Sequence, residues 1–196
     1  TSTDNGDLAP LSEARASDAA VDPGVLFAAG KPGSGRRLLL GAPGALSTTP
    51  GPQLIEARGA DRAAQEDSVR LRWTGAGTAV AAIVQDSPTD LSRQSNGDLA
   101  LELDVRVDTP PSAEVSLVMG CGAQCAGGFP LRAMLNEAAK TRKWTRIAIP
   151  LRCFEKAGVD MARVETPLSI TTSGKLDLIL SSARIVSPSG PVLQCK

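Results

Sequence analysis

The chain has 196 residues, of which 42% are hydrophobic, and its 21 basic side chains balance 21 acidic ones. This neutral balance gives no field that gathers phosphates or anionic lipids, so we expect neither nucleic acid nor a membrane surface as a partner. No apolar run approaches the roughly 20 residues of a spanning helix. The sequence contains no histidine, which excludes a Ser–His–Asp triad, a Cys–His pair and a zinc site built on imidazole.

Residues 1–35 are rich in Asp, Ala, Gly, Pro and Ser and show little periodicity. We interpret them as a linker or wrapping segment, with a short helix around Leu11–Ala16. A single folded domain is expected over residues 36–196. Because the chain begins with Thr1 rather than Met, we expect it to be a piece of a longer protein.

From Arg36 onward, short apolar or alternating stretches are separated by turn residues, which is typical of β-strands. Val69, Leu71 and Trp73 alternate with two arginines, and this period of two residues indicates a strand with one buried and one solvated face. The sequence predicts strands at 36–40, 53–58, 69–73, 78–84, 99–107, 113–119, 144–151, 168–172 and 176–186. It also predicts a helix at 131–140 and a short helix or loop at 153–162. This pattern predicts an all-β sandwich with one or two short helices.

The four cysteines are Cys121, Cys125, Cys153 and Cys195. Of the three ways to pair them, Cys121–Cys125 with Cys153–Cys195 is favoured, because the first closes a tight local loop and the second secures a chain end that would otherwise fray. The alternative is a zinc site made of cysteines alone, but the spacing lacks paired C-x-x-C motifs. Disulfides indicate an oxidising compartment, so we expect a periplasmic or secreted protein.

Two groups of acidic residues are candidate calcium ligands. Glu66 and Asp67 precede the strand that ends at Trp73, and loop carboxylates of this kind are typical ligands of Ca²⁺. The alternative is a polar turn in which Asp67 begins the strand. Asp177 lies within another predicted strand, where an inward carboxylate needs a cation or a hydrogen-bonded partner and an outward one is simply solvated.

The segment Asp90–Asp98 is a long polar loop between two apolar strands. Arg93, Gln94, Asn96 and Asp98 carry groups that can hydrogen-bond to sugar hydroxyls. A loop of this length in a compact domain is either functional or mobile.

Aromatic side chains that stack on sugar rings are scarce. Trp73 and Trp144 both fall in strand patterns, which predicts that they pack in the core rather than form an exposed platform. Nothing in the sequence singles out a pair of carboxylates for glycoside hydrolysis, which requires two of them about 5 Å apart. We therefore expect neither a catalytic residue in this chain nor strong independent sugar binding.

Five runs of sequence carry a resemblance to a known family: Gln65–Gly75, Asp90–Leu101, Met119–Cys125, Trp144–Met161 and Leu168–Leu176. Together they resemble the galactose-binding-like C-terminal accessory domain of exo-β-glucosidases (glucan glucohydrolases) of glycoside hydrolase family 3 from Gram-negative bacteria. The resemblance extends from about residue 36 to the end of the chain. The opening run Asp4–Leu11 is similar to the tail that leaves the second catalytic domain of these enzymes.

The resemblance implies a jelly-roll β-sandwich attached to a barrel domain and an α/β domain. Those preceding domains hold the Asp nucleophile and the Glu acid/base, so no residue here takes a catalytic role. It also implies that the loop at Arg93–Asp98 reaches toward the active-site mouth. The implied partners are the preceding catalytic domains and a β-glucan oligosaccharide. The wider superfamily often carries a structural calcium, for which Glu66, Asp67 and Asp177 are the candidates, and no other cofactor is required.

Three functions stay open from the sequence. The first is a non-catalytic domain that shapes or covers the substrate entrance of a family 3 β-glucosidase acting on β-glucans or cello-oligosaccharides. The second is an independent carbohydrate-binding module. The third is a purely structural or protein-interaction sandwich.

Overall fold

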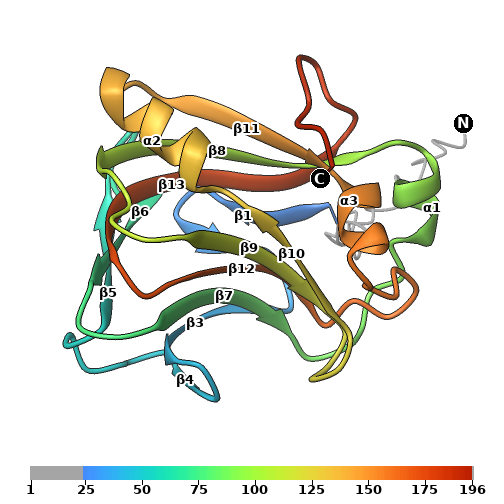
Figure 1. Cartoon of the computed structure of the whole chain (residues 1–196), viewed down its shortest axis with the longest axis horizontal. Helices are drawn as coiled ribbons and strands as arrows, with labels where there is room; N and C mark the ends of the chain where they lie inside the picture. The colour runs from blue at the N-terminus through green and yellow to red at the C-terminus, as the bar shows by residue number, and fades with distance from the viewer. Residues whose placement is uncertain (1–23, 196) are drawn as a thin grey trace, which may run out of the picture.

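The computed structural model describes residues 24–195, and two antiparallel β-sheets pack face to face across it (Figure 1). The larger sheet has seven strands. Five of them follow the order β11 (Thr145–Pro150), β8 (Ala100–Thr109), β13 (Lys175–Val186), β1 (Val25–Ala28) and β2 (Lys31–Pro32). The other two form a branch, in which β6 (Ser68–Thr74) pairs with β13 and β5 (Ile55–Ala60) pairs with β6. The smaller sheet has the order β10 (Ala126–Pro130), β9 (Val115–Gly120), β12 (Thr166–Thr172), β7 (Ala79–Gln85), β3 (Arg36–Ala42) and β4 (Ala45–Ser47). This confirms the predicted all-β sandwich.

The core lies between the sheets and follows from the alternation within each strand. In β8, Leu101, Leu103, Val105 and Val107 are buried, and the charged residues between them face outward. Trp73 packs among these residues with only 2% of its surface exposed, and its Nε1–H donates to the carbonyl oxygen of Ala79 at 3.1 Å. The prediction that Trp73 belongs to the core is therefore correct.

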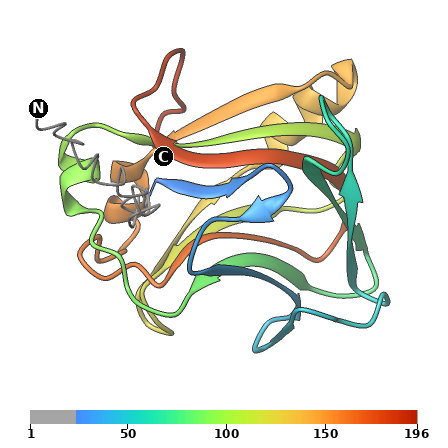
Figure 2. The same ribbon diagram turned by 180° about the vertical axis from the view of Figure 1, so that it is seen from behind.

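The larger sheet begins earlier in the chain than the sequence suggests. Residues 1–35 are predicted to be a linker or wrapping segment, but β1 pairs with β13 and β2 pairs with β1. Figure 2 shows this hairpin lying alongside β13. The sandwich thus includes Val25 onward rather than starting at Arg36, and the short helix expected around Leu11–Ala16 lies outside the described residues.

Three short helices accompany the strands in residues 24–195, one more than the upper number expected. Helix α2 (Arg132–Thr141) matches the predicted helix within a residue, and α3 (Leu151–Lys156) lies at the start of the predicted helix or loop. Helix α1 (Ser92–Asn96) lies in the segment expected to be an irregular polar loop. None of the helices in this range has the length and apolar character needed to span a bilayer.

The two disulfides have the pairing favoured from the sequence. Cys121–Cys125 closes the turn between β9 and β10. Cys153–Cys195 joins α3 to the C-terminal segment, which crosses the edge of the larger sheet and donates one hydrogen bond from the Leu193 amide to the Ala148 carbonyl in β11 at 3.0 Å. The second disulfide therefore holds the chain end against the sandwich.

Candidate functional site

The strand β13 changes its partner halfway along one edge. Its first half, Lys175–Leu180, pairs with β6, whereas β1 pairs with Ala183 and Arg184. Ser181 and Ser182 lie between the two partners, and the register with β8 shifts at the same point. Such a bulge puts two residues of one strand opposite one residue of its neighbour. The larger sheet is therefore interrupted beside two consecutive serines.

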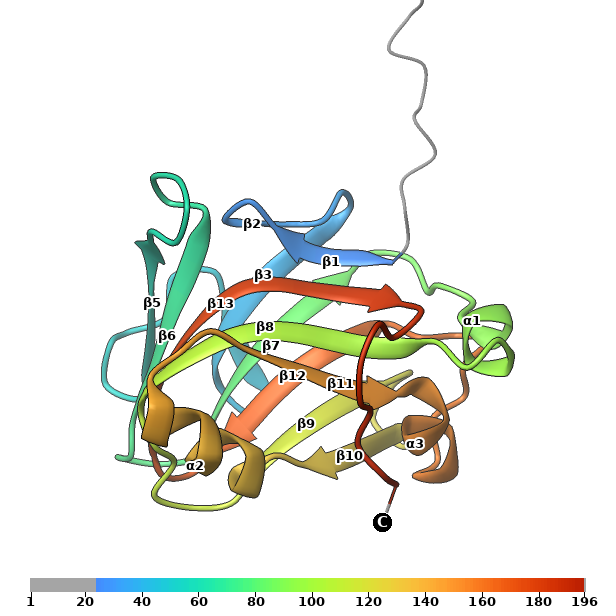
Figure 3. The ribbon, with the colours of Figure 1, turned by 90° about the horizontal axis from the view of Figure 1, so that it is seen from above.

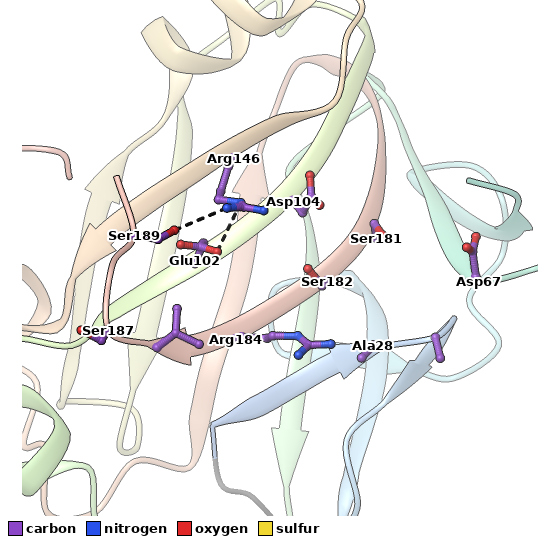
Figure 4. Close-up of a pocket in the computed structure, with 12 residues that line it drawn as sticks. Ala28, Asp67, Glu102, Asp104, Arg146, Ser181, Ser182, Arg184, Ser187 and Ser189 are labelled. Atoms are coloured by element: carbon purple, nitrogen blue, oxygen red, sulfur yellow. Dashed lines mark hydrogen bonds and ion pairs between the residues drawn. The ribbon is translucent and has the colours of Figure 1, made fainter. Parts of the chain in front are cut away.

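A groove of about 580 Å³ lies over this interruption on the outer face of the sheet. Figure 3 looks onto that face, where β1, β13, β8 and β11 run side by side. In Figure 4 the serines of β13 lie beside Glu102 and Asp104 of β8, with Arg146 of β11 on one side. The remaining walls come from the β1–β2 turn, from Asp67 and from the segment that follows β13.

Charges in the groove are largely paired. The Nε of Arg146 lies 3.4 Å from Oε1 of Glu102, and Nη1 of Arg146 donates to Oγ of Ser189 at 3.5 Å (Figure 4). Asp104 forms an ion pair with Arg62 from the loop between β5 and β6. Arg184 is exposed, and within residues 24–195 its guanidinium has no hydrogen bond or ion pair. The groove therefore offers one unpaired cation among compensated charges.

The far rim of the groove is a fixed loop. The Asp67 carboxylate accepts hydrogen bonds from the backbone N–H groups of Arg62, Ala63 and Ala64 at 2.7, 2.9 and 2.9 Å. These bonds, those from Ala63 and Ala64 above all, lower the pKa of Asp67 to about 2 because they stabilise its charged form. The Asp67 carboxylate thus closes the loop on itself, and the Asp61 carboxylate accepts a further bond from the Glu66 amide at 2.6 Å.

The β1–β2 turn contacts this loop through Gly30. Its φ of +76° is in the left-handed region, and a Cβ atom there would overlap the carbonyl oxygen of Glu66. Only glycine permits this approach without strain. The turn and the loop therefore meet on the side of the groove where β13 lacks a strand partner.

Trp144 lies on the same outer face and not in the core. It immediately precedes β11 and is half-buried, with the guanidinium carbon of Arg62 4.3 Å from its ring centroid and that of Arg106 at 5.8 Å. The prediction of core packing is wrong for Trp144, because Trp144 has the phase of the exposed Arg146 and not that of the buried Ile147 and Ile149, and the arginines cover the ring instead. Such cation–π contacts are worth about 0.5–1 kcal/mol at exposed positions.

An ion-pair network continues across this face away from the groove. Nη1 of Arg70 lies 2.9 Å from Oδ2 of Asp108 and 2.8 Å from Oδ1 of Asp177, and Arg106 contacts Asp108 at 3.0 Å. Partial burial alone raises the pKa of Asp108, but the hydrogen bonds from Arg106 and Arg70 outweigh it and lower the pKa. This carboxylate therefore stays ionised at neutral pH.

The candidate calcium ligands do not meet at one point. Asp177 lies opposite Arg72 in β6, and Asp67 lies five residues before Arg72, a separation of roughly 16 Å along an extended strand. Asp177 is paired with Arg70, Asp67 binds backbone amides, and Glu66 is exposed. In residues 24–195 no three acidic, cysteine or histidine side chains cluster as a metal site. Calcium binding by any of these carboxylates stays a prediction.

The predicted sugar-contacting residues lie on and after α1. Arg93, Asn96 and Asp98 are exposed, whereas Gln94 is half-buried with its Oε1 lacking a hydrogen-bond partner in the described residues. Arg152 holds the segment in place: its Nε lies 3.0 Å from Oδ1 of Asp98, and its guanidinium also donates to the carbonyl oxygens of Ser95 and Asn96 at 3.4 Å. The segment is therefore an anchored helical turn rather than an irregular loop.

Apart from Asp67, which was named as a calcium candidate, sequence reasoning missed the groove residues. Two adjacent serines inside the apolar run of 176–186 were a usable signal, since they interrupt the alternation of a half-buried strand. The outward arginines, Arg146 and Arg184, follow from the same alternation. These residues come together over the interruption only because β6 and β1 pair with different halves of β13. The local sequence pattern does not encode that pairing.

Comparison with solved structures finds the same fold in domains of carbohydrate-active enzymes. The extra C-terminal domain of an exo-1,3/1,4-β-glucanase from a Pseudoalteromonas species superposes with a TM-score of 0.68 at 19% identity, covering 87% of this chain and 96% of that domain. Against the longer chain of that enzyme the TM-score is 0.67 at 19% identity, covering 88% of this chain but only 21% of that one. A family 30 carbohydrate-binding module of a Clostridium thermocellum cellulase gives 0.54 at 15% identity, covering 86% and 95%.

A search of curated proteins found no match. A family model does match, over residues 47–185, which span β5 to nearly the end of β13 and include Arg146 and the two serines of the groove. The chain therefore belongs to the galactose-binding domain-like family Exop_C.

Proposed function

We propose that this chain is the non-catalytic C-terminal domain of a family 3 β-glucosidase that hydrolyses β-glucans or cello-oligosaccharides in its preceding domains. The observation that supports this most is membership of the Exop_C family together with a shared fold over 87% of the chain with the extra domain of a glucanase. Two carboxylates of the groove, Glu102 and Asp104, are each paired with an arginine, and the third, Asp67, binds backbone amides. This suits them for structural and binding roles.

In this proposal the anchored turn at α1 helps to shape the substrate entrance. The start of β1 and the residues after α1 lie at the same end of the sandwich, because the amide of Ile185 donates to Gly24 and Val186 pairs with Ala100. We propose that the preceding domain meets the sandwich at this end, where the chain enters β1. Arg93 and Asn96, exposed on α1, are the side chains best placed to meet it.

The first test is turnover of 4-nitrophenyl β-glucoside by the 196-residue chain. The expected rate equals that of buffer, and turnover above that background contradicts a non-catalytic domain. The second test joins the chain to the hydrolase domains proposed to precede it. Arg93→Ala and Asn96→Ala should then raise KM for oligosaccharides more than KM for the small aryl glucoside, because only longer substrates extend to the entrance. Arg37→Ala, on the smaller sheet, is the matched control.

A second candidate function, independent carbohydrate binding, is favoured by the polar groove on the outer face of the larger sheet. The shared fold with the family 30 carbohydrate-binding module is in line with it. The test is calorimetric titration of the chain with cello- and laminari-oligosaccharides, where heat of binding supports this function. Absence of binding with intact folding leaves the accessory role alone.

The two disulfides support placement of the protein in the periplasm or outside the cell, because such bonds persist in oxidising compartments. Fractionation of the source cells, followed by mass spectrometry with thiol labelling, checks both points together. Recovery of the protein from the cytoplasm with all four thiols reduced would contradict this placement.

A further inference from the structure

We infer that the groove over Ser181 and Ser182 is a binding site for a neutral sugar. This inference rests on the carbohydrate-binding function proposed above and assigns it to a specific place, the outer face of the seven-stranded sheet.

The shape of the groove favours a small ligand. Its volume of about 580 Å³ lies within the roughly 300–1,000 Å³ typical of small-molecule pockets. Between the segments of β13 that pair with β6 and with β1, the interruption leaves Ser181 and Ser182 without a strand partner. Two residues are too few to pair with an added β-strand, so an extended peptide is a poor fit. A ligand of one or two sugar rings fits the available space.

The charge of the groove favours a neutral ligand. It is lined by three carboxylates, those of Asp67, Glu102 and Asp104, and by the two guanidiniums of Arg146 and Arg184. Arg62, paired with Asp104, supplies a third positive charge and brings the sum to zero. A phosphate would meet the carboxylates, and a bare cation would meet the arginines, so both would lose hydration without net attraction.

The hydrogen-bonding groups of the groove match a polyol. Ser181, Ser182, Ser187 and Ser189 contribute hydroxyls that both donate and accept, and the apolar lining is limited to two alanines and one valine. A carboxylate of the groove can accept hydrogen bonds from two neighbouring hydroxyls of a sugar. The guanidinium of Arg184, which has no partner in residues 24–195, can donate hydrogen bonds to sugar oxygens. Bonds that involve a charged partner are the stronger ones.

The rim of the groove is already in its final shape. Asp67 closes the loop between β5 and β6 on itself, and Gly30 brings the β1–β2 turn into contact with that loop. Cys153–Cys195 holds the C-terminal segment, which begins with Ser187 and Ser189 on the opposite wall. Because these walls are already fixed, a ligand has little protein to order when it binds, and the entropic cost of binding is small.

The test is a titration of the ¹⁵N-labelled chain with cellotetraose and laminaritetraose, followed by amide chemical shifts. The inference expects shifts centred on Ser181, Ser182 and Arg184. Arg184→Ala and Ser182→Ala should raise the dissociation constant about tenfold or more for the arginine and severalfold for the serine. Arg37→Ala removes a comparably exposed arginine from the other sheet and should leave the affinity unchanged.

Each other outcome overturns the inference in a recognisable way. Sugar-induced shifts elsewhere, unchanged in Arg184→Ala, leave carbohydrate binding intact but place it outside the groove. No shift with either sugar overturns the groove and the binding function together, while the accessory role still stands or fails on the turnover and KM experiments. Shifts in the groove with inorganic phosphate or galacturonate oligomers but not with the neutral sugars show that its ligand is an anion.

Discussion

The disulfide Cys153–Cys195 should stabilise this domain much more than Cys121–Cys125. The cysteines of the first are 42 residues apart and those of the second only 4. In the chain-entropy treatment, closing these loops in the unfolded state stabilises the native protein by about 4 kcal/mol and about 2 kcal/mol, respectively. For a domain of this size, about 4 kcal/mol corresponds to a fall in Tm of roughly 8–16 °C.

The assay is urea unfolding followed by tryptophan fluorescence, with the double variants Cys153→Ala/Cys195→Ala and Cys121→Ala/Cys125→Ala compared under oxidising conditions. Cys153 is buried, so its replacement also removes packing in the core. A cleaner comparison adds reductant to the Cys121→Ala/Cys125→Ala protein, which opens the long loop without changing any side chain in α3. Equal stability of the two double variants, or no effect of reductant on this second protein, would refute the reasoning.

Three further results are expected. Gly30→Ala should lower the free energy of unfolding by at least about 1 kcal/mol in urea melts, because alanine is strained at this positive φ and its Cβ meets Glu66. Asp67→Asn should make the free energy of unfolding depend less on pH in the acid range. The pKa of Asp67 is lowered from 3.8 to about 2, so its charged form stabilises the fold above pH 3.8, and this stability is lost as the pH falls toward 2. Arg62→Ala should increase acrylamide quenching of Trp144 severalfold while Trp73 stays protected.

Each of these has a control elsewhere on the domain. Gly44→Ala also has a positive φ but no neighbour within 4 Å, so it separates backbone strain from the contact with Glu66. If both glycine variants lose the same stability, the contact adds nothing. Asp86→Asn is the control for Asp67, and an equal loss of acid dependence contradicts the role of the backbone amides. Arg58→Ala should leave the quenching of Trp144 unchanged, and equal quenching in both variants means that Arg62 does not cover the ring.

Much of the fold was predictable because each half-buried strand has a period of two. The alternation in β8 correctly assigns Glu102, Asp104, Arg106 and Asp108 to the solvent side. The same rule fails at Ile179, which faces outward with the charged residues and yet is only 2% exposed. Its neighbours across the sheet are Arg70 and Arg106, and the aliphatic stems of such arginines can shield an apolar side chain from water.

The candidate site was less predictable because it depends on contacts between distant segments. The strands β6 and β1 are far apart in sequence, and only their shared pairing with β13 creates the interruption at Ser181. The alternation in β11 places Trp144 on the outer face with Arg146, but the cover of its ring depends on an arginine from the distant loop between β5 and β6. Composition reveals the residues, but the tertiary pairing decides what they face.

The accessory and sugar-binding functions are compatible on this domain because the two candidate regions form one path. The groove runs along β13 from Ser181 toward Val186, and Val186 pairs with Ala100, which follows α1 after a short turn. The start of β1 lies at the same end. A glucan held over the serines would thus extend toward Arg93 and the entrance. If so, Arg184→Ala should lower kcat/KM of the joined enzyme for long oligosaccharides and leave kcat/KM for the small aryl glucoside unchanged. Equal losses for both substrates would mean that the groove acts only through folding.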